Sequence, residues 1–409
     1  MVRSIACSLA IVIAYSASLQ AQGGIKKGAV KSVDPEKSTL IVSADGKDLS
    51  FIVTDETRIM DAAGKPVKDR LKDKAIKEGV PVMFKAETKD GKMVLVGLKL
   101  ASDDKPVKLE KADTSKLIPL NELGKDEYKS FPGGLYPDGR NERPAEHEKA
   151  GLAFAKLVTP LDSDGKPDGD GKIVLISVGI SNTTQEFSAF QKAADADKAK
   201  NPKLLLLDGA QGGATAAMVQ DPESNGGERY WATVDQRLKS AGVTRAQVQV
   251  AWVKEADARP TDAFPKHAQT LEAELGKIAQ VLHDRFPNLK LVYLSSRIYA
   301  GYATTPLNPE PFAYESGFAV KWLIEKQIKG DKTLNYDAEK GKVNSAWLSW
   351  GPYLWANGPA KRTDGLTYEE SDFSSDGTHP SNAGREKVAD QLLLFFKSDT
   401  TTKTWFVKN

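Results

Sequence analysis

The body of the chain has almost no cysteine, little histidine and no long apolar run. Its 409 residues include one Cys and four His, so a disulfide framework and a Cys-based metal site are not expected. Lys and Arg number 57 and Asp and Glu number 55. No basic block interleaved with aromatics appears, which argues against nucleic-acid binding. Since no later stretch approaches 18 uninterrupted apolar residues, no transmembrane helix is expected either.

The first residues have the pattern of an export signal. Arg3 precedes a short, largely apolar run, and small and polar residues follow with a cleavage site expected after Ala21. Because the run is too short to span a membrane, residues 1–21 are predicted to be a cleaved signal peptide of a secreted or periplasmic protein. Cleavage would remove Cys7, the single cysteine, and leave no thiol chemistry.

The next regions differ in periodicity. Residues 24–101 contain five short segments rich in β-branched residues, separated by turn signals such as ADGK and KDGK. They predict a small all-β barrel or sandwich. No aromatic binding face is visible in it, so a structural or targeting module is one interpretation. Residues 102–150 are polar and rich in Pro and Gly, which favours a linker followed by an ordered segment that leads into the next domain.

Residues 151–409 alternate between apolar strands and helices. Strands are expected at residues 171–179, 202–210, 246–256 and 289–297, with a fifth near 346–350. Helices are expected at residues 184–200, 264–286, 313–329 and 382–397. Continuous apolar strands alternating with helices predict an α/β domain whose parallel sheet is covered on both faces. In such sheets the functional site lies at the carboxyl ends of the strands.

Two polar motifs are candidates for this functional site. In the stretch SDGTHPSNAG, Asp376 precedes His379 by three residues, just before the last helix. A histidine suits proton transfer, and an aspartate at this spacing can fix its tautomer, although Asp, Gly and Pro also form ordinary turns. Ser181 follows the first strand at a helix N-terminus, where partial positive charge favours an oxyanion. A helix cap is the alternative interpretation.

The ends of the second and third strands add further candidates. Gly212 and Gly213 follow the second strand, and glycines there let a backbone N–H approach a ligand closely or form a tight turn. Lys254 and Glu255 lie at the end of the third strand. They are either site residues or solvated ones.

Taken in order, these features resemble the SGNH hydrolase superfamily, also called GDSL esterases, over about residues 171–397. The resemblance is carried by Gly179-x-Ser181 and by Asp376-Gly-Thr-His379-Pro380. It implies a flavodoxin-like three-layer α/β/α sandwich with a five-stranded parallel sheet. It also implies ester hydrolysis through an acyl-enzyme, with no metal and no organic cofactor.

The resemblance also implies roles for single residues. Ser181 matches the nucleophile, His379 the general base and Asp376 the residue that orients the base. Gly213, or Gly212 in a second alignment of the loop, matches the glycine whose N–H joins that of Ser181 in the oxyanion hole.

Two positions depart from the family pattern. Ile180 stands where the family usually has Asp, and Lys254 stands where it has the Asn that donates to the oxyanion. Lys254 can donate in place of that Asn or pair with Glu255.

The remaining candidates are weaker. Arg297 follows the fourth strand and could bind an anionic or hydroxyl-rich substrate, and Trp350 and Tyr353, with Trp355, could wall a cleft or pack the core. Tyr302 and Glu315 are minor candidates, as is His147 in the segment before the domain, whereas His267 and His283 are expected on a helix, packed or at its surface.

The sequence thus predicts a secreted serine ester hydrolase with a Ser-His-Asp triad. A small-molecule ester or an acylated carbohydrate is the expected substrate. The alternative is a non-catalytic carbohydrate-binding or envelope protein on a degenerate SGNH scaffold, and a third class is a structural envelope protein that docks through the β domain. The acyl group, the alcohol and the oligomeric state are left open.

Overall fold

A computed structural model describes residues 25–44, 46–61, 66–89, 91–100 and 112–408. The predicted signal peptide, residues 1–21, lies outside the described residues. The chain divides into two compact units, Met1–Pro106 and Val107–Asn409, and each is described by itself.

The described part of the first unit contains a closed five-stranded β-barrel with strand order β1-β2-β3-β5-β4. Its strands are β1 (Lys26–Asp34), β2 (Thr39–Ala44), β3 (Lys47–Met60), β4 (Pro81–Lys89) and β5 (Lys92–Leu100). Gly46 and Gly91, in the predicted ADGK and KDGK turns, have φ of 73° and 74°, which glycine adopts without strain. Inside, Phe51 packs on Phe84 with ring centroids 5.0 Å apart. The predicted small β domain is confirmed as a barrel.

The second unit is built on a five-stranded sheet in which every neighbouring pair is parallel, in the order β12-β11-β10-β8-β9. The strands are β8 (Ile173–Gly179), β9 (Leu204–Asp208), β10 (Val248–Lys254), β11 (Leu291–Leu294) and β12 (Trp347–Trp350). Every residue of β8 and β10 is buried, as expected for strands covered on both faces. The expected mixed α/β unit with a parallel sheet is confirmed.

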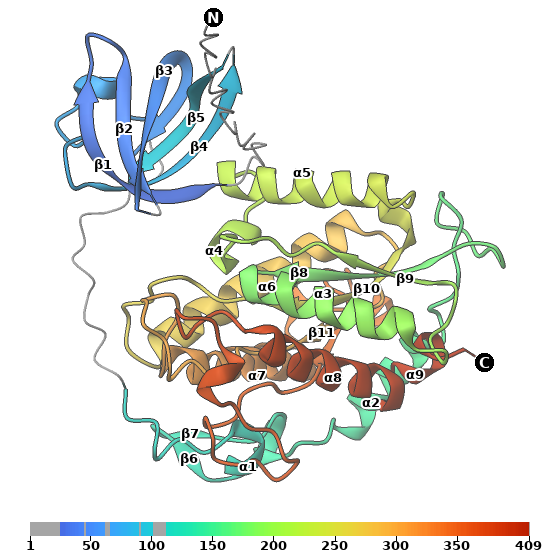
Figure 1. Cartoon of the computed structure of the whole chain (residues 1–409). Coiled ribbons are helices and arrows are strands. Elements are labelled where there is room, and N and C mark those ends of the chain that lie inside the picture. The colour runs from blue at the N-terminus through green and yellow to red at the C-terminus, as the bar shows by residue number, and fades with distance from the viewer. Residues whose placement is uncertain (1–24, 45, 62–65, 90, 101–111, 409) are drawn as a thin grey trace, which may run out of the picture. The chain divides into compact units, whose positions relative to one another are not determined.

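Helices cover both faces of this sheet (Figure 1). The main ones are α3 (Ser181–Ala196), α5 (Asn225–Ser240), α6 (Lys266–Arg285), α7 (Phe312–Ile328) and α8 (Asn382–Ser398). The chain steps one way from β8 to β9 and the opposite way through β10, β11 and β12. Right-handed crossovers therefore place α3 on one face and α5, α6 and α7 on the other. Helix α8 packs on α3, and α6 packs on α7.

Helix α5 was not predicted. Its first turn contains Gly226 and Gly227, and glycine lowers helix propensity. The structure gives a packing reason for one of them, because a Cβ on Gly227 would lie 1.9 Å from the carbonyl oxygen of Asp221. Ser224 caps the helix by accepting a hydrogen bond from the N–H of Gly227.

Shorter elements complete the second unit, and several of them come before the sheet. They are α1 (Leu120–Leu123), β6 (Glu127–Tyr128), β7 (Phe131–Pro132), α2 (Ala145–Ala155), α4 (Ala216–Val219) and α9 (Lys403–Phe406). The segment before the sheet packs on the end of the domain, where Tyr353 Oη accepts from Leu120 N–H at 3.0 Å and Trp350 Nε1 donates to Leu135 O at 2.6 Å. Helix α2 crosses residue 150, where the sequence placed the start of the domain.

Candidate active site

The candidate site lies where the strand order reverses, at the carboxyl ends of β8 and β10. Ser181 follows β8 and is the first residue of α3. Gly179 lets the two strands end close together, since a Cβ there would lie 2.3 Å from Lys254 O and 2.4 Å from Thr183 Oγ1. The crevice outside the strand ends at such a reversal is where open α/β sheets bind ligands.

Three of the predicted residues come together in a hydrogen-bonded chain. Ser181 Oγ lies 2.8 Å from His379 Nε2, and His379 Nδ1 lies 2.5 Å from Asp376 Oδ2. The His379 side chain is 24% exposed, so the protein covers most of the ring and leaves part of it open to solvent. This is the order of contacts that a nucleophile, a base and an orienting carboxylate require.

The turn before α8 holds the carboxylate in place. Asp376 Oδ1 accepts from the backbone N–H groups of Thr378 and His379, both at 3.0 Å. Burial acts to raise the pKa of Asp376, but the hydrogen bonds from His379 and Thr378 outweigh it and lower the pKa. Gly377 has φ of 62°, and a Cβ there would lie 1.9 Å from Tyr302 O. The turn therefore requires glycine at that position.

A neighbouring residue that the sequence did not single out ties the nucleophile to this turn. Asn182 Nδ2 donates to Thr378 O at 2.9 Å, and Asn182 is buried. The bond links the first turn of α3 to the loop that carries His379. The only feature of the sequence that could have pointed to Asn182 is its position directly after Ser181.

Two kinds of backbone N–H are available to an oxyanion. The first N–H groups of a helix have no intrahelical partner, and Ser181 supplies one at the start of α3. The loop after β9 approaches the same residue, because a Cβ on Gly212 would lie 3.9 Å from Ser181 Cβ. Gly213 has φ of 81°, a conformation that favours glycine.

Lys254 pairs with a carboxylate, although not with Glu255. Its Nζ donates to both carboxylate oxygens of Glu186 at 2.9 and 2.7 Å, and both side chains are 0% exposed. Successive side chains of a strand point to opposite faces, so Glu255 leaves the strand on the other side. Burial lowers the pKa of Lys254, while Glu186 opposes that change. Glu186, on α3, was missed because its role depends on how α3 packs on β10.

Arg297 follows β11 as expected but is buried rather than open to a substrate. The residue is 1% exposed, and its Nε and Nη2 have no hydrogen-bond partner among the described residues. Burial lowers its pKa, and the carboxylates of Glu186, Glu310 and Asp376 act to raise it. Because Arg297 is buried, the structure does not support contact between its side chain and a substrate.

The predicted aromatic wall belongs to the core. Trp350 is 2% and Tyr353 is 5% exposed, and Trp355 is fully buried. Trp350 and Tyr353 are covered by the segment before the sheet, through the hydrogen bonds to Leu135 and Leu120. Neither ring offers an open face to a substrate. Both rings pack in the core, which was the second of the two interpretations of the sequence.

The other histidines lie outside this chain of contacts. His147 Nε2 donates to Leu348 O at 2.8 Å within the core, and His283 lies near the end of α6. His267, expected on a helix, has its Nε2 2.8 Å from Oε2 of Glu315, one of the minor candidates. Tyr302, another minor candidate, donates its hydroxyl to Tyr368 O at 3.1 Å.

The described residues contain no group of three or more His, Cys, Asp or Glu placed to hold a metal ion. Within the same residues, no helix has both the length and the apolar character needed to cross a membrane.

Comparisons with known proteins give distant structural likenesses. No family model matches the chain, and no curated protein matches it. A protein from Slackia heliotrinireducens proposed to be an SGNH hydrolase is 16% identical, covering 55% of this chain and 99% of its own, with a TM-score of 0.28. The periplasmic domain of a lipopolysaccharide acetyltransferase from Salmonella ser. Paratyphi A is 12% identical, covering 60% and 94%, with a TM-score of 0.31.

A shorter likeness is to apo-CusF from Escherichia coli, 20% identical, covering 20% of this chain and 93% of that one, with a TM-score of 0.15. At these scores the likenesses carry no functional argument, and the site is interpreted from its own geometry.

Proposed function

We propose that the second unit is an acyl-transferring serine enzyme, and specifically an ester hydrolase. The observation that carries the proposal is the chain of contacts Ser181 Oγ to His379 Nε2 to Asp376, at 2.8 and 2.5 Å. Asp376, kept ionised by its N–H donors, holds the proton of His379 on Nδ1 and leaves the Nε2 lone pair facing Ser181.

The reaction follows from this arrangement. His379 Nε2 takes the proton of Ser181 Oγ as that oxygen attacks the acyl carbonyl. The same proton is then delivered to the departing alkoxide, which leaves as the alcohol. Water attacks the acyl-enzyme in a second cycle, assisted by His379, and releases the acid and free Ser181.

Backbone N–H groups support the tetrahedral intermediate. We assign this role to the N–H of Ser181 and to the loop of Gly212 and Gly213, which approaches Ser181. Lys254 is not assigned to it, because Glu186 occupies its Nζ. Such preorganised donors are typically a large electrostatic contribution to acyl transfer.

We also propose where the protein acts and what it acts on. The pattern of residues 1–21 favours an exported protein. An acylated carbohydrate is the proposed substrate, in keeping with the resemblance to SGNH esterases.

The direct test is hydrolysis of 4-nitrophenyl acetate by the mature protein and by Ser181→Ala and His379→Ala. We expect activity in the parent and its loss in both variants. Ser188→Ala is the matched control, since Ser188 is exposed on the same helix. Undiminished activity in Ser181→Ala would reject the assignment. Glycan binding without hydrolysis, unchanged in that variant, would select the non-catalytic binding protein.

A further inference from the structure

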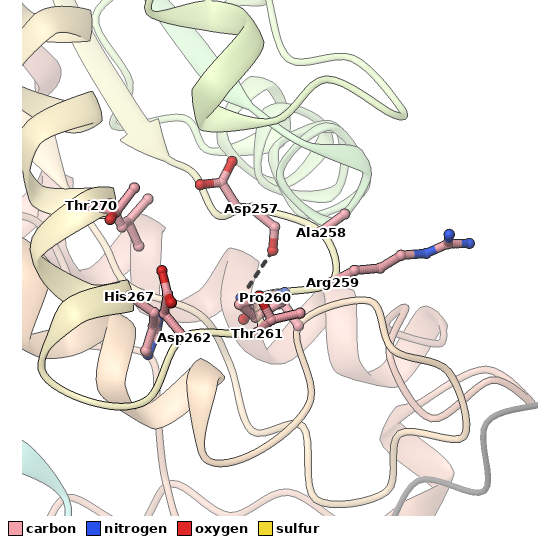
Figure 2. Close-up of a pocket in the computed structure, with 10 residues that line it drawn as sticks. Asp257, Ala258, Arg259, Pro260, Thr261, Asp262, His267 and Thr270 are labelled. Carbon is pink, nitrogen blue, oxygen red and sulfur yellow. Dashed lines mark hydrogen bonds between the residues drawn. The ribbon is translucent and has the colours of Figure 1, made fainter. Parts of the chain in front are cut away.

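A second feature at the same edge of the sheet is not used by the triad. It is a cavity of about 220 Å³ bounded by the loop after β10, the start of α6 and Asn308 (Figure 2). At roughly 30 Å³ per water in the liquid, it has room for about seven waters, which is the scale of one small ring. The triad residues do not line it.

Hydrogen bonds connect this cavity to both loops that carry the catalytic groups. On one side, Asp257 Oδ1 accepts from the N–H of Ala217 at 3.2 Å, directly after the loop of Gly212 and Gly213. On the other side, the N–H of Arg259 donates to Pro306 O at 3.1 Å.

That second connection continues to the turn of the triad. Thr305, which precedes Pro306, has its Oγ1 3.4 Å from Thr378 Oγ1, and the N–H of Thr304 donates to Asp376 O at 2.9 Å. The cavity wall is therefore joined to the oxyanion loop and to the His379 turn, as a subsite of the same active site would be.

The cavity lining is polar and suits hydroxyl groups better than an acyl chain. Asp262 accepts from Lys266 Nζ. Asp257 accepts from Ala217 N–H and also hydrogen-bonds the carboxyl of Glu274, whose pKa is raised by burial and by Asp257. A carboxylate can accept several, so each retains lone pairs for hydroxyl donors. Thr261 and Thr270 also line the cavity. The hydroxyl of Thr270 donates to Lys266 O at 3.1 Å and keeps its lone pairs for a ligand donor. An apolar chain would remove the remaining lone pairs of the lining from water without giving them donors, which is costly.

Positive charge in the lining is limited. In Figure 2 the side chain of Arg259 extends away from the other lining residues. The site therefore presents acceptors and hydroxyls to a ligand and no guanidinium, which disfavours a phosphate or carboxylate group.

A hydrogen bond to Glu315 orients the His267 side chain in the lining. Its Nε2 is taken by Glu315, and Glu315 Oε1 also accepts from Tyr128 Oη at 2.7 Å and from Lys129 Nζ at 2.9 Å. Burial acts to raise the pKa of Glu315, but the hydrogen bonds from His267, Tyr128 and Lys129 lower it. The carboxylate thus stays charged and fixes the ring, which leaves Nδ1 as the ring atom available to a ligand.

We propose that this cavity is the subsite for the alcohol part of the substrate, a hydroxyl-rich group the size of one sugar ring, and that His267 and Thr270 determine specificity for it. The proposal rests on the proposed function, because it assigns the leaving-group side of the same site. The acyl group stays at Ser181, and the released alcohol departs from the cavity.

The test compares two substrates in each variant. One is 4-nitrophenyl acetate, whose leaving group has no sugar hydroxyl for the lining to bind, and the other is a set of mono-O-acetylated methyl hexosides. We expect His267→Asn and Thr270→Val to lower kcat/KM for at least one acetylated hexoside by roughly 5- to 20-fold, mainly through KM. The value for 4-nitrophenyl acetate should stay within about twofold.

His283→Asn is the matched control, because His283 lies on the same helix 16 residues further along, which is roughly 24 Å at ~1.5 Å per residue. Thermal melts check that each variant is folded, and Thr270→Val changes an exposed residue if His267→Asn proves unstable.

Each outcome has a distinct meaning. Equal kcat/KM for the sugar esters in parent and variants would overturn the subsite, as would equal losses on both substrates. A parent active on 4-nitrophenyl acetate and inactive on every acetylated hexoside would overturn the subsite and leave the proposed function standing. A parent inactive on both would overturn the proposed function and the subsite with it.

Discussion

The role of Lys254 gives the sharpest quantitative prediction, because it decides between a structural ion pair and an oxyanion donor. Lys254 and Glu186 are both fully buried and share two hydrogen bonds of 2.9 and 2.7 Å. Removing one partner of such a pair leaves an uncompensated buried charge, which typically costs about 3–5 kcal/mol. Lys254→Met should therefore lower the free energy of unfolding of the second unit by that amount.

Replacing both partners should have a much smaller effect. Apolar residues of similar volume in place of a buried ion pair are often neutral or stabilising, so Lys254→Met with Glu186→Leu should recover most of the loss. With the fold restored, kcat on 4-nitrophenyl acetate should stay within a few-fold of the parent, since neither side chain is assigned to the chemistry.

Urea unfolding followed by tryptophan fluorescence measures this in the full chain. All seven Trp residues lie beyond residue 230, so the signal reports on the second unit alone. Lys149→Met is the matched control, because Lys149 and Glu146 form an exposed pair and such pairs contribute little. The reasoning is refuted if Lys254→Met is as stable as the parent while kcat falls by about 10²–10³, the usual effect of losing an oxyanion donor.

Three further predictions follow from single contacts. Burial lowers the pKa of His147 from 6.5 to about 4. Between these pH values only the unfolded state binds the proton, so the free energy of unfolding should fall by roughly 3 kcal/mol as the pH is lowered through that range. Urea melts at several pH values should show a smaller change with pH in His147→Gln than in the parent. Asp376→Asn should lower kcat on 4-nitrophenyl acetate by about 10⁴, the scale for loss of the orienting carboxylate, while thermal melts show that the variant is still folded. Gly377→Ala should lower both kcat and the melting temperature, because its Cβ would lie 1.9 Å from Tyr302 O.

Much of the site could be predicted because its signals are local. Ser181 lies at the end of a continuous apolar strand, and Asp376 and His379 share one short turn. The strands were identifiable because a parallel sheet buried on both faces needs uninterrupted apolar residues.

What could not be predicted depends on contacts between distant segments. Trp350 is buried by Leu135, 215 residues away in the sequence, and Glu186 meets Lys254 across 68 residues. Strand alternation separates Lys254 from Glu255, but only the packing of α3 on the sheet identifies the actual partner. Helix α5 was missed for a different reason: two adjacent glycines lower helix propensity, and the close approach of Asp221 to Gly227 is visible only in the structure.

The central claim is that His379 activates Ser181 as a nucleophile. Labelling with a fluorophosphonate tests it without knowledge of the substrate, because the reagent phosphonylates an activated serine. The account predicts labelling of the mature protein at Ser181, located by peptide mass spectrometry. In His379→Ala, labelling should be slower by at least 10²-fold. Absence of labelling in the folded parent, or equal labelling of His379→Ala, would contradict it.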